Sequence, residues 1–259
     1  MRRSLLSLAA AAALVIGLAG CSAGSSPEPT EAASQEAPLI VFAAASLQSS
    51  FDELAAAFEA EHPEYPVDEI RYDGSQALAT QLVDGADADV IAFASEASIV
   101  PVVDAGVADE TTLFATNTLQ IAVAPGNPKG IEALTDLADD AITVVLCAPE
   151  VPCGAASQTL LTDAGVTVTP ASEETNVTSV VRRVTDGEAD AGLVYATDVQ
   201  DSAGALEGIT PENAQVAVNR YPLAIAANAP SPDGAAAFVD FVLSDAGQKI
   251  LADHGFGAP

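Results

Sequence analysis

The chain has 259 residues, with 37 Asp and Glu against 8 Lys and Arg, and carries a formal net charge of −29. Such an acidic surface repels nucleic acid and anionic lipid, so neither is expected as a binding partner. It also repels anions at long range, so an anion site here has to act through short-range dipoles. The length suits one large domain or two modest lobes.

The first twenty residues have the layout of a signal peptide. Arg2 and Arg3 precede an apolar run from Leu5 to Leu18, which is too short for a comfortable membrane span. The small residues before Cys21 are typical of a bacterial lipobox, although an ordinary secretory signal with an incidental cysteine is the alternative. We therefore expect residues 1–20 to be removed and Cys21 to carry a lipid that anchors an exported protein to the extracytoplasmic face of the cell membrane. Residues 21–37 are rich in Ser, Pro, Glu and Ala, which predicts a flexible linker.

From Pro38 onward, apolar strand-like runs alternate with amphipathic helix-like runs. The strands are expected at Leu39–Ala44, Val67–Tyr72, Asp89–Ala94, Leu119–Ala124, Ile142–Cys147, Ala191–Tyr195, Gln215–Asn219 and Leu223–Ala227. The helices are expected at Phe51–Glu61, Gln76–Asp84, Ser98–Ala105, Ile131–Leu137, Ala155–Ala164, Val177–Asp186, Gly234–Leu243 and Asp245–His254. This alternation predicts an α/β fold with open sheets and helices on both faces.

Motifs of catalysis and nucleotide binding are missing from the sequence. From Pro38 onward it contains no G-x-G-x-x-G fingerprint, no P-loop and no G-x-S-x-G elbow. His62 and His254 lie far apart in polar helical contexts, which favours surface positions over metal ligation. We expect no enzymatic activity, no cofactor and no site for a free metal cation.

Small hydroxyl and amide donors stand where predicted strands lead into helices. Ser46 and Ser75 follow strands, Tyr195 ends one, and Cys153 lies between a strand and the next helix. Ligands of open α/β sheets bind beyond the carboxyl ends of strands, and helix N-termini favour anions. Taken singly, each residue is better explained as a helix cap or a core residue.

Taken together, these segments resemble the molybdate-binding proteins of bacterial ABC uptake transporters. The resemblance runs from about Pro38 to the end and rests on Phe42-Ala43-Ala44-Ala45-Ser46-Leu47, Gly74-Ser75, Leu78-Ala79, Ala88-Asp89-Val90, Val151-Pro152-Cys153-Gly154, Gly187 to Tyr195, Tyr221-Pro222 and Gly247-Gln248. It implies capture of molybdate or tungstate and delivery to a membrane permease.

The resemblance also implies a set of ligand donors. Ser46, Ser75 and Tyr195 would donate from their hydroxyl groups, and Cys153 and Val177 from their backbone N–H groups. Molybdenum would therefore be bound as molybdate. Cys153 replaces a small alanine of the family, which keeps the amide donor but adds a bulkier side chain to the pocket.

The implied fold is a two-lobed periplasmic-binding-protein fold of type II, with a mostly parallel sheet in each lobe. Lobe 1 would comprise residues 38–118 and 221–259, and lobe 2 residues 119–220. Two crossing strands, near Leu119 and near Gln215, would form the hinge. A monomer is expected, and closure around the ligand would signal occupancy to the permease.

Several alternatives remain open at this point. Sulfate or another tetrahedral oxyanion is the nearest one, whereas a phosphate carrier would need an acidic acceptor beside Ser46 or Ser75. Cys147 and Cys153 could also serve an extracellular thiol-redox enzyme, although five residues separate them rather than the usual two. Because the protein is exported, we expect these two cysteines to form a short-loop disulfide, the alternative being two buried thiols.

Overall fold

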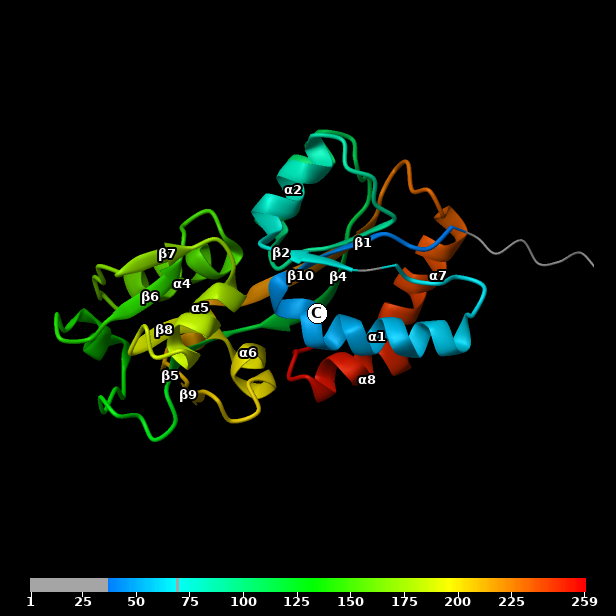
Figure 1. Cartoon of the computed structure of the whole chain (residues 1–259). Coiled ribbons are helices and arrows are strands. Elements are labelled where there is room, and N and C mark those ends of the chain that lie inside the picture. The colour runs from blue at the N-terminus through cyan, green and yellow to red at the C-terminus, as the bar shows by residue number, and fades with distance from the viewer. Residues whose placement is uncertain (1–36, 69) are drawn as a thin grey trace, which may run out of the picture. The chain divides into compact units, whose positions relative to one another are not determined.

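The computed structural model describes residues 37–68 and 70–259. The expected signal peptide, the lipidated Cys21 and the linker as far as residue 36 lie outside the described residues. Within the described part, two five-stranded sheets are each flanked by helices (Figure 1). The predicted α/β, two-lobed fold class is confirmed. None of the described helices is both long enough and apolar enough to cross a membrane.

The first sheet has the strand order β2-β1-β3-β10-β4. Strand β1 pairs in parallel with β2 and β3, whereas β10 pairs antiparallel with β3 and β4. Its strands are β1 (Val41–Ala44), β2 (Arg71–Asp73), β3 (Val90–Ala92), β4 (Thr112–Asn117) and β10 (Asn219–Ile225). Its helices are α1 (Gln48–Glu61), α2 (Ser75–Val83), α3 (Glu96–Asp104), α7 (Pro232–Leu243) and α8 (Asp245–Asp253), and a 3-10 turn, η1 (Ala45–Leu47), links β1 to α1.

The second sheet has the order β7-β6-β8-β5-β9 and repeats this mixed pattern. Strand β6 is parallel to β7 and β8, and β5 is antiparallel to β8 and β9. Its strands are β5 (Leu119–Val123), β6 (Val144–Cys147), β7 (Ser172–Glu174), β8 (Ala191–Tyr195) and β9 (Glu207–Ile209). Its helices are α4 (Pro152–Asp163), α5 (Val177–Thr185) and α6 (Ala196–Asp201), with 3-10 turns η2 (Leu134–Ala138) and η3 (Ala214–Ala217).

The chain crosses between the sheets twice within its described part. It leaves the first sheet at the end of β4, Asn117, and enters the second at Leu119, the start of β5. It returns between Ala217, the end of η3, and Asn219, the start of β10. Because Thr118 and Val218 are single linking residues, the two crossings join the sheets closely.

The structure departs from the sequence-based expectations in the pairing of the sheets and at the second crossing. Each sheet is mixed, with two parallel and two antiparallel pairings, rather than mostly parallel. The strand expected at Gln215–Asn219 is wrong, because most of that segment forms η3. Ala214 and Ala217, three residues apart, are its buried members, so the segment buries a helical rather than an alternating pattern.

Alternating side chains of β1 face two hydrophobic clusters. Val41 and Ala43 join the cluster with α1, α7 and α8, whereas Phe42 joins the one with α2 and α3. Period-two alternation in a strand produces this division. The buried Asp89 accepts hydrogen bonds from the backbone N–H groups of Ile40 and Ser231, at 2.8 and 2.7 Å. Both faces of the sheet are therefore covered at β1. This packing fixes the position of β1 and of Ser46, which lies in the turn that follows it.

Candidate functional site

A small cavity of about 10 Å³ lies where the carboxyl-terminal ends of strands from both sheets meet. All five predicted donors line it, three from segments that follow the second sheet's strands and two from the first sheet. The lining residues are Ala44, Ala45, Ser46, Asp73, Gly74, Ser75, Ala94, Val151, Pro152, Cys153, Asn176, Val177 and Tyr195. The volume is close to the least that holds one water molecule, so the walls of the cavity lie close together.

Three α-helices begin at the cavity. Helix α2 starts at Ser75, α4 at Pro152 and α5 at Val177. The first N–H groups of a helix have no acceptor within that helix, and the helix dipole places partial positive charge at this end. The backbone N–H groups of Cys153 and Val177 are therefore available to an anion in the cavity without any need for a cationic side chain.

The two serines are not helix caps. The residue at the N-cap of η1 is Ala44 and that of α2 is Gly74, and neither helix start has a side-chain cap hydrogen bond. Ser75 Oγ instead accepts from the backbone N–H of Ala94 at 3.0 Å. Since this oxygen is already an acceptor, the hydroxyl proton of Ser75 is left to donate elsewhere. The interpretation of these serines as caps is therefore wrong for this chain.

Tyr195 contributes a buried donor at the end of β8. The residue is only 1% exposed, and its hydroxyl oxygen makes no hydrogen bond of good geometry among the described residues, with the side chains of Tyr221 and Asn219 nearby. Burial, above all other effects, raises the pKa of Tyr195 far above its ordinary value, so the hydroxyl keeps its proton. A buried polar group without a partner costs about 1–3 kcal/mol. A ligand oxygen that accepted from Tyr195 would remove that cost.

The cavity wall includes one carboxylate, one oxygen of which already accepts two hydrogen bonds. Asp73 Oδ1 accepts from the backbone N–H of Gly74 at 2.7 Å and from Asn176 Nδ2 at 3.0 Å. Among the described residues that line the cavity, none is Lys or Arg. The wall therefore offers neutral hydroxyl and amide donors, which form strong charge-assisted hydrogen bonds with an anion.

Segments of the two sheets touch beside the cavity. Gln76 Nε2 donates to the backbone carbonyl of Thr175 at 2.8 Å, and the Asp73–Asn176 bond makes a second contact of this kind. A Cβ at Gly74 would lie 2.3 Å from the Thr175 oxygen, so a larger residue would force this contact apart. These residues hold the cavity in its narrow form.

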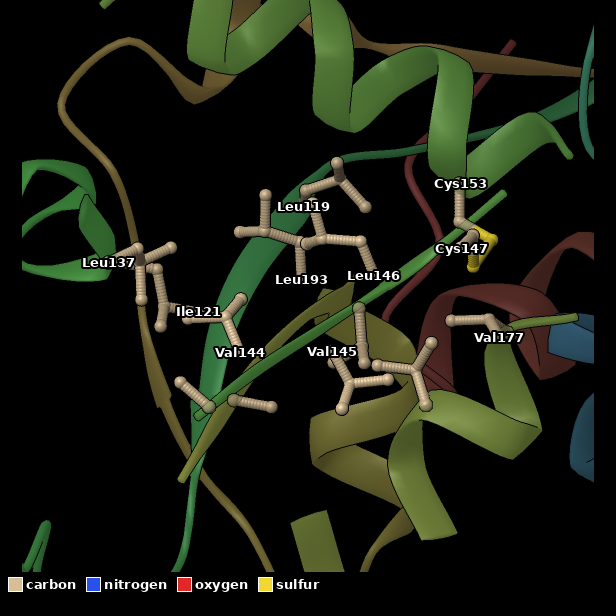
Figure 2. Close-up of a cluster of buried hydrophobic side chains, with 14 of the residues drawn as sticks. Leu119, Ile121, Leu137, Val144, Val145, Leu146, Cys147, Cys153, Val177 and Leu193 are labelled. Atoms are coloured by element: carbon tan, nitrogen blue, oxygen red, sulfur yellow. A yellow bond between two sulfur atoms is a disulfide. The ribbon is translucent and has the colours of Figure 1, made fainter. Parts of the chain in front are cut away.

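Cys147 and Cys153 form a disulfide in the structure, between the end of β6 and the start of α4 (Figure 2). Their Cα atoms are 5.8 Å apart, and both residues are buried, with 3% and 2% exposure. Catalytic thiols are partly exposed so that they can meet their substrates. The burial thus argues against a thiol-redox site. Among the described residues, no group of His, Cys, Asp or Glu is arranged to hold a metal ion.

Sequence reasoning missed part of the wall and the support behind it. Asp73 and Asn176 were not singled out, although Asp73 lies two residues before Ser75 and Asn176 directly before Val177. Tyr221 and Asn117 are buried polar residues that support Ser46 from behind. Tyr221 could have been found because it stands in Tyr221-Pro222, one of the motifs on which the resemblance rests. For Asn117 the sequence offers only a single amide side chain after an apolar stretch.

Comparisons with known proteins agree with this geometry. Residues 39–257 match the family described as bacterial extracellular solute-binding protein. The molybdate-binding protein ModA of Mycobacterium tuberculosis H37Rv is 42% identical over 253 residues, covering 96% of this chain and 95% of the relative. The solved periplasmic molybdate-binding protein of Azotobacter vinelandii shares the fold with a TM-score of 0.74, 20% identity and coverage of 85% and 99%. The sulfate-binding protein SubI of M. tuberculosis has a TM-score of 0.75, 22% identity and coverage of 85% and 86%.

Proposed function

The chain belongs to the family of bacterial extracellular solute-binding proteins, and we propose that it captures molybdate or tungstate and delivers the ion to the permease of an ABC transporter. The observation that carries this proposal is the donor-lined cavity between the sheets, with the buried, unpartnered hydroxyl of Tyr195 in its wall. The 42% identity to a molybdate-binding protein supports the same ligand.

In this proposal, Ser46, Ser75 and Tyr195 donate from their hydroxyl groups, and Cys153 and Val177 from their backbone N–H groups. A tetrahedral dianion presents four oxygens that only accept, so each donor finds a matching acceptor. The absence of Lys and Arg from the described wall avoids the cost of desolvating a cation. Because the cavity is small, an organic solute would require the sheets to stand further apart.

We further propose that the two sheets are the cores of the two lobes, residues 38–118 with 221–259 and residues 119–220. Ser46 and Ser75 then belong to lobe 1, and Cys153, Val177 and Tyr195 to lobe 2. A ligand that contacts both lobes stabilises the closed arrangement by the contacts it makes only there. The crossings at Thr118 and Val218 are where the chain would bend as the lobes open.

The proposed place of action is the extracytoplasmic face of the cell membrane, with a monomer held there by lipid on Cys21. The linker of residues 21–37 would let the binding domain reach the permease while remaining anchored. The support for this arrangement is the signal-peptide and lipobox pattern of the sequence.

A ligand panel tests the proposed function. A ligand present at 100 times its dissociation constant stabilises a folded protein by ~2.7 kcal/mol. We expect molybdate and tungstate to raise the melting temperature of the purified protein at low concentration, and sulfate and phosphate to leave it unchanged at the same concentration. Calorimetric titration with the same four ions then ranks their affinities. Sulfate or phosphate binding as tightly as molybdate would contradict the proposal.

A further inference from the structure

The side-chain amide of Asn117, at the end of β4, has one orientation that satisfies its neighbours. Its Oδ1 accepts from the backbone N–H of Thr118 at 3.0 Å. Since a backbone N–H can only donate, the amide nitrogen must lie on the other side. From there Asn117 Nδ2 donates to Thr197 Oγ1 at 2.8 Å, and at 3.5 Å it makes a longer contact with the hydroxyl of Tyr221.

The hydroxyl of Tyr221 stands between Asn117 and Ser46. Tyr221 is completely buried, and its oxygen lies 3.0 Å from Ser46 Oγ. The amide of Asn117 can only donate to it, so the single phenolic proton is free to point at Ser46. Burial raises the pKa of Tyr221 above its ordinary value, so that proton is kept at neutral pH. These partners are compatible with a hydrogen bond donated by Tyr221 to Ser46.

This direction determines what Ser46 offers to the cavity. When its oxygen accepts from Tyr221, the serine proton is left to donate into the space that Ser46 lines. Ser75 is oriented in the same way, because its oxygen accepts from the backbone N–H of Ala94. In this arrangement each serine oxygen accepts from a buried donor, and each serine proton is directed into the cavity.

We propose, on the basis of the function proposed above, that Tyr221 is a positioning residue that directs the Ser46 proton into the cavity and so favours fully deprotonated oxyanions over those that carry a proton. Tyr221 does not line the cavity and acts through Ser46. A dianion without protons meets a donor at each wall hydroxyl. Monohydrogen phosphate carries a proton of its own, which would face another donor instead of an acceptor and lose a hydrogen bond.

Replacement of the phenol tests this role. In Tyr221→Phe the Ser46 oxygen loses its donor, so the serine hydroxyl can turn and accept from a ligand. We expect molybdate to bind ~5- to 10-fold more weakly, the loss of about one oriented hydrogen bond. Inorganic phosphate near neutral pH should bind as before or more tightly. The dissociation constants of phosphate and molybdate should therefore differ by a smaller factor than in the parent. A loss of packing alone would weaken the binding of molybdate and of phosphate by the same factor.

Two comparisons make the result specific. Tyr72→Phe removes another phenol, one that donates to Asp52 Oδ1 at 2.8 Å and lies outside the cavity lining, and should leave both affinities unchanged. In a double-mutant cycle, Tyr221→Phe should cost molybdate affinity in the parent and almost nothing in a Ser46→Ala background.

The outcomes separate the two proposals. A parent protein that binds neither molybdate nor tungstate contradicts the proposed function itself. A parent that binds molybdate, together with a Tyr221→Phe variant that behaves like Tyr72→Phe, contradicts only the positioning role. Additive losses for Ser46→Ala and Tyr221→Phe would contradict it as well, because Tyr221 would then act independently of Ser46.

Discussion

At the scale of single residues, Tyr195 gives the sharpest test of the binding site. Its hydroxyl is buried and makes no hydrogen bond of good geometry among the described residues, so it lowers the stability of the ligand-free protein. We predict that Tyr195→Phe leaves the free energy of unfolding without ligand unchanged or raises it by up to ~1–3 kcal/mol. The same change should weaken molybdate binding by ~1.5–3 kcal/mol, the usual value of a hydrogen bond to a charged group.

The opposite signs distinguish a binding donor from a packing residue. Denaturant unfolding without ligand measures the first effect, and calorimetric titration measures the second. Ser75→Ala serves as the comparison, because it weakens binding but also leaves the buried N–H of Ala94 without its acceptor. A Tyr195→Phe variant that is less stable and binds molybdate like the parent would place the hydroxyl outside the site.

For single residues, the sequence predicts the position of a donor but not the direction of its hydroxyl. Ser46 and Ser75 each lie two residues after the end of a strand, β1 or β2, so their place at a sheet edge is readable from local pattern. The direction of the Ser46 hydroxyl is not readable, because it depends on Tyr221, 175 residues away along the chain. That contact exists only once β10 lies in the first sheet, between β3 and β4.

At the scale of elements, the loop from β6 to α4 joins a disulfide to a proposed ligand donor. Cys147 ends the strand and Cys153 lies in the first turn of the helix, six residues apart in sequence. For a loop this short, the chain-entropy model gives a stabilisation of ~2.4 kcal/mol. We predict that reduction lowers the free energy of unfolding by about this amount and weakens molybdate binding only modestly, since the Cys153 amide and the other donors remain.

Unfolding and ligand titration, each with and without reductant, measure both effects. A variant with Cys147→Ala and Cys153→Ala is the matched control and should not respond to reductant. Mass analysis after alkylation of the unfolded, unreduced protein checks the bond directly. If both cysteines are labelled without reductant, the protein lacks the disulfide and the expected loss of stability does not arise.

The same scale separates elements that the sequence predicts from those that it does not. The bounds expected for β8, Ala191–Tyr195, match the structure because this buried strand is an uninterrupted apolar run. Strand β7, Ser172–Glu174, was missed because its three residues are polar and it is a strand only by pairing with β6 at the sheet edge. Segment Gln215–Asn219 misled because its apparent alternation is partly solvent-exposed, with Val216 46% exposed.

At the scale of the whole molecule, α6, next to the second sheet, contacts the C-terminal end of α8, next to the first, and His254 there also reaches α1. His254 bridges these helices, with Nε2 3.0 Å from Glu53 Oε2 and Nδ1 3.2 Å from Asp201 Oδ1. Close by, Gln200 Nε2 donates to the backbone carbonyl of Asp253 at 2.7 Å. Opening of the proposed lobes would separate Asp201 from His254, so this bridge belongs to the closed form.

The charge of His254 should therefore influence closure. Partial burial alone would lower the pKa of His254, but the hydrogen bonds with Glu53 and Asp201 outweigh burial and hold the pKa above its ordinary value of 6.5. A raised pKa in the closed form means that proton binding favours closure. The added stability is fully present below the ordinary pKa and is lost as the pH rises through the raised one.

We predict that molybdate binding weakens as the pH rises from about 6 to about 8, the range in which histidine titrates. Partly exposed ion pairs contribute about 0.2–1 kcal/mol, so a ~2- to 5-fold change in dissociation constant is expected. Asp198, whose pKa burial raises to about 7, titrates in the same range and lowers stability in the same direction. Its effect has to be separated from that of His254.

His254→Gln makes that separation, because it removes the titrating group and leaves Asp198 in place. The variant should bind molybdate more weakly than the parent near pH 6 and equally well near pH 8, when the parent histidine has lost its proton. Calorimetric titration of both proteins at several pH values measures the two slopes, and any dependence that they share belongs to Asp198 or to the ligand. If the slopes are equal across the whole range, the histidine bridge does not contribute to closure.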